Sequence, residues 1–278
     1  MTDSNATVAR HSGELIAALS GRRPSRNLHS DVMWRLGLAI VSGRYPEGTI
    51  LPTDGELLAE FGVSRTVLRE ALKSLAAKGM IEARARIGTR VLPRGRWNLF
   101  DSDVLAWHFE LGPDVAFLRS LAEVRIGIEI EAAALAAERR SPAQAADLLD
   151  LAEQLGRAET PEEFARYDLE FHRAVALVSA NPFMASISAL VELALTASFT
   201  ISSPIMVPGA LEAAVRSHRR IAQAIEKGAP QEARDAMKAV IAEGFTRAAE
   251  RLEQGIPRSP KAPPGKSPKS PHEKSRAD

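Results

Sequence analysis

The sequence contains no cysteine among its 278 residues. This absence excludes disulfides and thiolate metal sites, and it is compatible with the reducing cytoplasm, where we expect the protein to reside. No apolar run approaches the length of a membrane span, so no membrane partner is expected. Residues 6–20 are mixed and polar and lack the pattern of a secretory signal. The sequence also shows no nucleophile motif and no phosphate-binding loop, which disfavours an enzyme.

The composition is that of an ordinary globular protein long enough for two domains, with 45% hydrophobic and 26% charged residues. The formal net charge is only +1, but the charges are segregated. Residues 25–96 contain 12 Lys/Arg and 7 Asp/Glu. A modest positive balance on one segment fits a DNA-binding unit that works as a pair.

Residues 50–91 predict a winged helix-turn-helix. A helix is expected to begin after Ser64, whose hydroxyl can cap it. Its buried face is formed by apolar residues spaced i, i+3, i+4 and i+7. These are Leu68, Ala71, Leu72 and Leu75. The opposite face carries Arg65, Thr66 and Arg69, side chains that suit phosphate oxygens and guanine edges in a major groove.

The segments on either side of this helix complete the unit. Thr53 and Glu56 have the spacing of a capping box for a preceding short helix, and Gly62 begins a tight turn. After the second helix, two short strands form a wing whose tip carries Arg84 and Arg86. Alone, this pattern could be a structural helical hairpin with a solvated charged face; the agreement of caps, turn and wing favours DNA binding.

The domain plan follows from composition and helix signals. We expect a disordered arm over residues 1–24, the winged unit over 25–93 and a linker over 94–105. Residues 106–254 should form an all-α antiparallel bundle, since Ser141-Pro142 and Thr160-Pro161 are helix starts and no period-2 run is found. The proline- and lysine-rich residues 255–278 predict a disordered basic tail. The predicted fold class is mainly α, with the winged unit first and the bundle second.

One polar constellation lies in the helical half. Asp168 and His172 are four residues apart on one predicted helix, and His218 lies on a later one, so the three could hold a divalent metal. Taken singly, each histidine is more often a surface or core residue. Arg125 and Glu129 form a second pair at i, i+4; a buried arginine in a bundle needs a carboxylate, either Glu129 or a ligand.

These segments resemble a known family. LPTDGELLAEFGVSRTVLREALKSLAAKGMIEARARIGTRV is similar to the N-terminal domain of GntR transcription factors. EVRIGIE, DLEFHRAVALVSANP and SHRRIAQAIEKGAPQEARDAM resemble the effector domain of their FadR subfamily. The linker RWNLFDSDVLAWHFELG looks most like that of galactonate-responsive members.

The resemblance implies a homodimer that binds a palindromic operator and is regulated by a small carboxylate or sugar acid. It also implies a metal, with zinc the first choice, held by an Asp and three His. Asp168, His172 and His218 match three of these ligands, whereas the fourth position is Val240. A three-ligand site completed by water or effector, and a site that has lost its metal and holds the effector directly, both remain open.

Further residues carry over from the family one by one. Ser64, Arg65, Thr66 and Arg69 match its DNA-contacting stretch, and Gly88 matches the glycine of the wing tip. In the effector domain, Arg125 matches the pocket arginine and Asn181 a small polar position near the pocket. A frequent DNA-contacting arginine of the family is replaced here by Gly55, so base preference at that position is expected to differ.

The sequence therefore predicts a ligand-responsive transcriptional regulator, in the first instance a repressor released by a sugar acid or another small carboxylate. Two alternatives stand beside it. One is a constitutive dimeric DNA-binding protein whose bundle only dimerises, which Val240 favours. The other is a metal-dependent hydrolase built on Asp168, His172 and His218, which lacks a recognisable general base.

Overall fold

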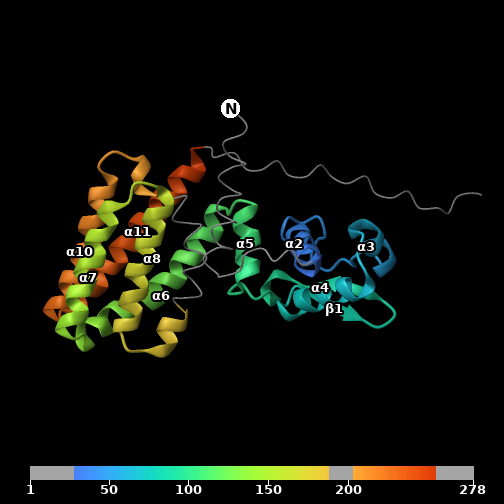
Figure 1. The fold of residues 1–278 in the computed structure, drawn as a ribbon, viewed down its shortest axis with the longest axis horizontal. Coiled ribbons are helices and arrows are strands. Elements are labelled where there is room, and N and C mark those ends of the chain that lie inside the picture. Colours follow the sequence, from blue (N-terminus) through green and yellow to red (C-terminus); the bar gives the residue numbers. More distant parts are fainter. Residues whose placement is uncertain (1–27, 188–202, 255–278) are drawn as a thin grey trace, which may run out of the picture.

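The computed structural model describes residues 28–187 and 203–254. The arm expected over residues 1–24 and the tail expected over 255–278 lie outside the described residues. Within them, a winged unit and a helical bundle stand side by side, with a short helix between them (Figure 1). The mainly α fold class, with a winged helix-turn-helix followed by an all-α body, is confirmed.

The winged unit is built from three helices and a two-stranded sheet. Its elements are α2 (Leu28–Val41), α3 (Asp54–Phe61), α4 (Arg65–Ala77), β1 (Ile81–Arg84) and β2 (Gly88–Val91). Thr53 and Glu56 form the complete capping box of α3, and Gly62 ends that helix in the left-handed region with φ 64°. Ser64 caps α4, because its Oγ accepts a hydrogen bond from the amide of Val67 at 3.4 Å.

The wing is an antiparallel pair in which Ile81 lies opposite Val91 and Arg84 opposite Gly88. Ile81 and Val91 are buried, while the rest of β1 is exposed. The wing is therefore anchored at its base and projects its tip into solvent. One apolar core, which includes Leu36, Leu57 and Leu68, joins all three helices to the base of the wing.

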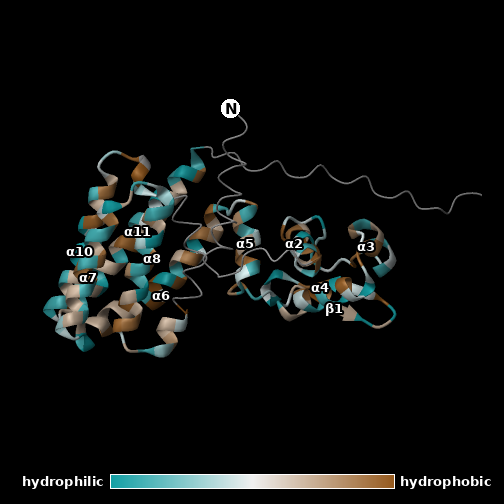
Figure 2. Cartoon of the chain, in the orientation of Figure 1, coloured by the Kyte–Doolittle hydropathy of each residue, from teal (hydrophilic) through white to brown (hydrophobic). Residues whose placement is uncertain are grey.

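The bundle contains five long helices in the described residues. They are α6 (Val115–Arg139), α7 (Pro142–Gln154), α8 (Pro161–Val178), α10 (Ala210–Lys227) and α11 (Pro230–Glu253), with short turns η2 (Leu155–Arg157) and η3 (Pro204–Met206). Ser141 and Thr160 cap α7 and α8, each with proline in the first turn. Hydrophilic residues lie along the outer sides of α8 and α10 (Figure 2). No helix in the described ranges is long and apolar enough to cross a membrane.

The segment expected to be a linker is largely helical. It contains η1 (Arg94–Arg96) and the first residues of α5 (Ser102–Glu110), which continues past residue 105 without a break. Val104 and Trp107 of α5 belong to the core of the winged unit. Leu105 and Phe109 belong to a second cluster with residues of α6 and α11. Helix α5 is thus buried on two sides, once in each half of the protein.

Polar contacts reinforce the seat of α5 on the winged unit. Lys78, which follows α4, is buried and places its Nζ 2.7 Å from both Asp101 Oδ1 and Asp103 Oδ2. The indole nitrogen of Trp34 in α2 donates a hydrogen bond to Glu110 Oε2 at 3.1 Å. Burial raises the pKa of Glu110, and the bond from Trp34 opposes that rise. These contacts tie the recognition helix and α2 to the same short helix.

The approach of α5 to α2 requires glycine at position 37. A Cβ added to Gly37 would overlap the six-membered ring of Trp107, which is fully buried. Gly127, in α6, has open space around the same position. The two glycines therefore form a matched pair in which only one is held by packing.

We predict opposite effects for alanine at these two glycines. Gly37→Ala should destabilise the protein by about 1–3 kcal/mol, because the Trp107 ring must move. Gly127→Ala should stabilise it by roughly 0.5–1 kcal/mol, since alanine is the better helix former. Urea unfolding followed by tryptophan fluorescence measures both. Equal effects of the two substitutions would contradict the tight packing at Gly37.

Candidate DNA-binding surface and effector site

The exposed face of α4 carries the residues predicted to read DNA. Arg65, Thr66 and Arg69 are all exposed, and neither arginine forms an ion pair with a carboxylate of the described residues. The nearby Glu70 is instead paired with Lys73 at 2.7 Å. The guanidinium groups of Arg65 and Arg69 therefore project into solvent at the start of the helix. Ser64 is exposed but uses its hydroxyl as the helix cap.

The wing tip presents a second basic group of residues. Arg84 is exposed and paired with Glu82 at 2.9 Å, whereas Arg86 occupies the turn with a left-handed φ of 63°. Gly88 has φ 112°, a value that L side chains rarely adopt, and a Cβ there would lie 3.0 Å from Ile50. The glycine of the wing tip thus has a backbone reason to be glycine, separate from any contact with DNA.

Position 55 is open in this protein. Gly55 lies in the first turn of α3, is exposed, and has only the Thr53 hydroxyl at 4.0 Å from an added Cβ. An arginine would fit there without displacing any neighbour. Its absence removes one potential DNA contact from the surface that α3 and α4 present.

The three residues predicted to bind a metal come together inside the bundle. Asp168 and His172 project from α8 and His218 from α10, and all three are buried. One candidate ligand atom from each lies within 4.8 Å of the other two. His218 Nε2 is 2.9 Å from Asp168 Oδ1, and His172 Nε2 is 3.8 Å from Asp168 Oδ2.

The outer nitrogens of both histidines face acceptors. His218 Nδ1 is 2.8 Å from the carbonyl oxygen of Ala214, so this nitrogen carries the proton of the neutral ring. His172 Nδ1 is 2.8 Å from Glu129 Oε2. In both rings Nε2 is left to face Asp168. Metal-binding histidines in proteins are oriented in this way, with the second N–H held by a carboxylate or carbonyl.

The short approach of His218 Nε2 to Asp168 needs a positive charge between the two atoms. A neutral His218 that donates from Nδ1 has a lone pair on Nε2, which faces a carboxylate oxygen at 2.9 Å. Neither Asp168 Oδ2 nor His218 Nε2 has a hydrogen-bond partner of good geometry among the described residues. A proton or a metal ion at this point would satisfy both atoms, and the donor set suits zinc.

Arg125 and Glu129 flank this cluster from α6. Arg125 donates to both oxygens of Glu129, from Nε at 2.6 Å and from Nη2 at 3.1 Å, and both residues are buried. Burial raises the pKa of Glu129, but the charges and hydrogen bonds of Arg125 and His172 outweigh it and bring the pKa down to about 2. Burial is likewise outweighed at Asp168, where His172, His218 and Arg125 lower the pKa. Both carboxylates are therefore charged ligands at neutral pH.

The fourth ligand position of the family is apolar here. Val240 of α11 is 7% exposed and packs in the main core of the bundle with Phe171. The residues present fit a three-ligand metal site, in which a position stays open to water or ligand. They do not fit a closed four-ligand site.

Asn181, also predicted at the effector pocket, has structural contacts. It follows the end of α8, and its Oδ1 accepts hydrogen bonds from the amides of Phe183 at 3.0 Å and Met184 at 3.4 Å. The side chain thus caps the helical turn that follows. A contact between Asn181 and the effector stays a prediction.

Sequence reasoning missed Arg247. This α11 residue is half-buried, and its charge interacts with that of Asp168. Its signal was available, because Arg247 follows Val240 by seven residues and so returns to the same face of the helix.

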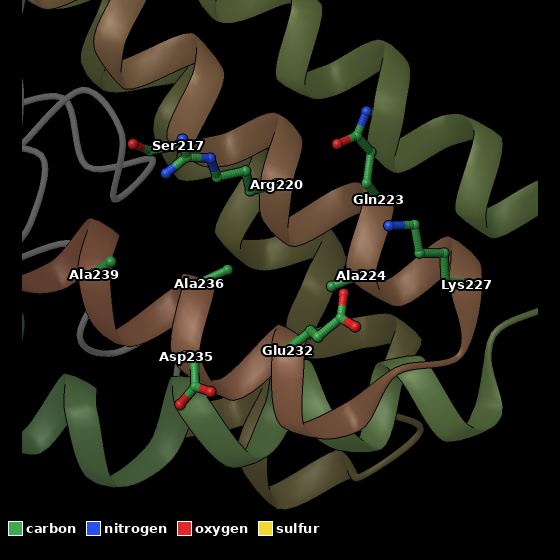
Figure 3. A pocket seen from close by; sticks show the side chains of 9 residues that line it. All are labelled: Ser217, Arg220, Gln223, Ala224, Lys227, Glu232, Asp235, Ala236 and Ala239. Carbon is green, nitrogen blue, oxygen red and sulfur yellow. The ribbon is translucent and has the colours of Figure 1, made fainter.

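A surface pocket of about 390 Å³ between α10 and α11 is separate from the cluster (Figure 3). Arg220 and Lys227 of α10 and Glu232 and Asp235 of α11 contribute its charges, which balance. Ser217 lines this pocket while its neighbour His218 points into the bundle. Because its charges cancel and it contains none of the clustered residues, we place the effector site at the buried cluster.

A winged helix-turn-helix with free arginines, joined to a bundle that encloses a polar cluster, defines a ligand-responsive transcriptional regulator. Comparison with known proteins makes this specific. Residues 28–91 match the family "Bacterial regulatory proteins, gntR family", and residues 120–243 match the FCD domain. The chain belongs to the GntR family and is of the FadR type.

Two relatives from Escherichia coli K12 illustrate the likeness. The uncharacterised regulator YieP is 38% identical over 59% of this chain and 73% of its own length. The galactonate operon transcriptional repressor is 37% identical over 55% of this chain and 67% of its own. These relatives are regulators and not enzymes, so the hydrolase alternative is set aside.

A solved structure shows the same fold. Lar, which controls the expression of the Listeria monocytogenes agr system, superposes with a TM-score of 0.59 over 82% of this chain and 99% of its own, at 18% identity. At that identity the likeness concerns the fold alone.

The buried pair in α6 yields a prediction about stability. Glu129→Leu should destabilise the protein by about 3–5 kcal/mol, because it leaves the Arg125 charge buried without its carboxylate. The double substitution Arg125→Met with Glu129→Leu should recover most of that loss, since both charges are removed together. Urea unfolding of the two variants makes the comparison. A double variant as unstable as the single one would show that the pair itself is not the source of the effect.

Proposed function

We propose that the protein is a homodimeric repressor whose two winged units bind a palindromic operator and whose bundle releases them when it binds a small carboxylate. The observation that carries the DNA-binding part is the pair of exposed guanidinium groups, Arg65 and Arg69, at the start of α4. Two recognition helices must reach half-sites about 34 Å apart, one turn of duplex DNA, which a monomer cannot do. The second copy thus completes the reading surface.

The wing adds affinity rather than sequence reading. Arg84 and Arg86 at its tip suit phosphate or the minor groove, where charge matters more than base identity. Sequence is then read by Arg65, Thr66 and Arg69 in the major groove. With glycine at position 55, the operator is expected to differ from those of family members that carry arginine there.

The proposed effector is a sugar acid or another small carboxylate. One supporting observation is the similarity to the galactonate operon repressor, whose name states its ligand class. The other is the charge of the buried cluster, where the cationic Arg125 lies beside ligand atoms of Asp168, His172 and His218. A carboxylate entering the cluster would meet positive charge in a setting of low dielectric.

We also propose a divalent metal, zinc in the first instance, held by Asp168, His172 and His218. When bound, the ion supplies a Lewis-acid site for the effector's carboxylate and hydroxyl oxygens. Glu129 would fix the ring of His172, and the carbonyl of Ala214 would fix that of His218. Val240 leaves the remaining position to the effector.

A constitutive DNA-binding protein is the second candidate. The observation that favours it is Val240, because a bundle that has lost a ligand position can also have lost ligand control. In that case the cluster would act only as a buried polar core.

We predict that Arg69→Ala weakens operator binding by about 1–3 kcal/mol if Arg69 contacts a base, and by less if it contacts phosphate. The two cases differ in salt dependence, because loss of a phosphate contact lowers the salt slope by about one unit. Gel-shift titration at several salt concentrations measures both quantities.

Arg219→Ala is the matched control, because this exposed arginine pairs with Glu153 in the bundle, away from the DNA surface. It should bind the operator as the unmodified protein does. Operator affinity unchanged in Arg69→Ala would remove α4 as the reading helix. Adding galactonate and related sugar acids to the same complexes tests release, and a complex that no acid dissociates supports the constitutive candidate.

For the metal, we predict about one zinc ion per chain by elemental analysis. Chelation should lower the free energy of unfolding by about 2.7 kcal/mol when the free ion is at a hundred times its Kd. His218→Gln should remove the ion and the response to chelation. His29→Gln is the control, since His29 lies in α2 near Ser74. Protein whose melting temperature ignores both zinc and chelator would contradict the proposed site.

A further inference from the structure

Helix α11 brings one more charged group to the effector site. Val240, Gly244 and Arg247 follow one another at i, i+4 and i+7, so they share one side of the helix. Val240 packs in the same core as Phe171 of α8. The Phe171 ring in turn lies edge-on to His218, with 5.1 Å between ring centroids. This side of α11 therefore faces the polar cluster.

Glycine at position 244 gives the Arg247 side chain room to fold back along the helix. An ideal Cβ on Gly244 would lie 4.0 Å from Arg247 Nη2, so the guanidinium lies over the glycine. Arg247 is half-buried in this position. Burial lowers its pKa, and the charges of Asp168 and Glu243 oppose that change, which is the behaviour of a cation drawn toward the cluster.

The buried charges set a requirement on the ligand. Among the described residues the two carboxylates, Glu129 and Asp168, are balanced by the two guanidinium groups, Arg125 and Arg247. A divalent ion bound at the cluster would leave two positive charges in excess. Excess charge in a site of low dielectric is costly, and a ligand with two negative charges removes it.

We propose that Arg247 binds a second acid group of the effector, so that the site prefers a diacid to a monoacid of the same carbon skeleton. This inference rests on the proposed carboxylate effector and deepens it. The first acid group takes the open position at Asp168, His172 and His218. The second meets Arg247, because Glu129 already engages Arg125 through both of its oxygens.

The position of Arg247 also connects the ligand to the joint between the two halves. Phe245 and Ala248, its neighbours on α11, pack in the cluster that contains Leu105 and Phe109 of α5. A diacid that draws Arg247 inward therefore acts on the helix turn that supports α5. Release of DNA should follow diacid binding more strongly than monoacid binding.

The test is isothermal titration of the zinc-loaded, full-length protein with two matched pairs of probes. Galactarate and galactonate differ only in the oxidation state of one terminal carbon, as do glutarate and 5-hydroxypentanoate. The unmodified protein should bind the diacid of at least one pair roughly tenfold to a hundredfold more tightly. Arg247→Gln should abolish that preference and leave monoacid affinity within about twofold.

Arg234→Gln is the matched control, because Arg234 lies near the start of α11 and pairs with Glu131 on the surface. It should keep the diacid preference in full. Equal weakening of both acids by Arg247→Gln would show that Arg247 only holds Asp168 in place, and would overturn the proposal. A monoacid that binds as tightly as its diacid to the unmodified protein would overturn it too, while leaving the carboxylate effector intact.

If neither member of either pair binds while zinc and operator do, both the diacid inference and the carboxylate effector are overturned. A gel shift with the same probes gives an independent readout. Galactarate should release the operator at lower concentration than galactonate, and Arg247→Gln should make the two concentrations equal.

Discussion

The double burial of α5 is the constraint on which the rest of this structure depends. A nine-residue helix is marginal by itself, so α5 is held by what it packs against. One side, through Trp107, fills a space that exists because residue 37 is glycine. The other side, through Phe109, meets α6 and α11. Any change in the direction of α11 must therefore be accommodated at α5, and through it at the recognition helix, whose last turn leads into Lys78.

The buried polar cluster is the second constraint, and it opposes stability. Two carboxylates, two histidines and a guanidinium lie in a core otherwise filled by alanine, leucine and phenylalanine. Removing such groups from water is costly, and attraction among them recovers the cost only when each is well partnered. The contact between His218 and Asp168 is the least well satisfied of these, and it marks the place where a ligand or ion would contribute most. A site that is incomplete in this way is suited to shift its energy on binding.

Much of this arrangement was predictable from sequence. Capping signals at Thr53, Ser64 and Ser141 located helix starts correctly, because a cap depends on a few neighbouring residues. The i, i+4 spacing of Asp168 and His172 placed them on one face for the same local reason. The two roles of α5 were not predictable, because they depend on long-range packing of Trp107 against Gly37. Arg247 was missed because its side chain reaches the cluster only through the absence of a side chain at Gly244, a contact that no linear motif encodes.

Local rules also explain what the sequence suggested about Asn181 and Gly88. Both are positions where the backbone makes a demand, a helix cap in one case and a positive φ in the other. A residue can match a family pattern for such a reason without touching any ligand. Val240 is the converse, since a change at a single position there alters the chemistry of the site while leaving the fold intact.

Ligand control in this protein requires the effector to distinguish two arrangements of the winged units, because a ligand with equal affinity for both shifts nothing. Helix α11 is placed to make that distinction. It contributes Val240 and Arg247 to the effector side and Phe245 and Ala248 to the side that meets α5. Thermodynamic linkage then requires the operator to alter effector affinity by the same factor by which the effector alters operator affinity. The short stretch of α11 between Val240 and Ala248 is thus the part of the chain where ligand chemistry and DNA reading are exchanged.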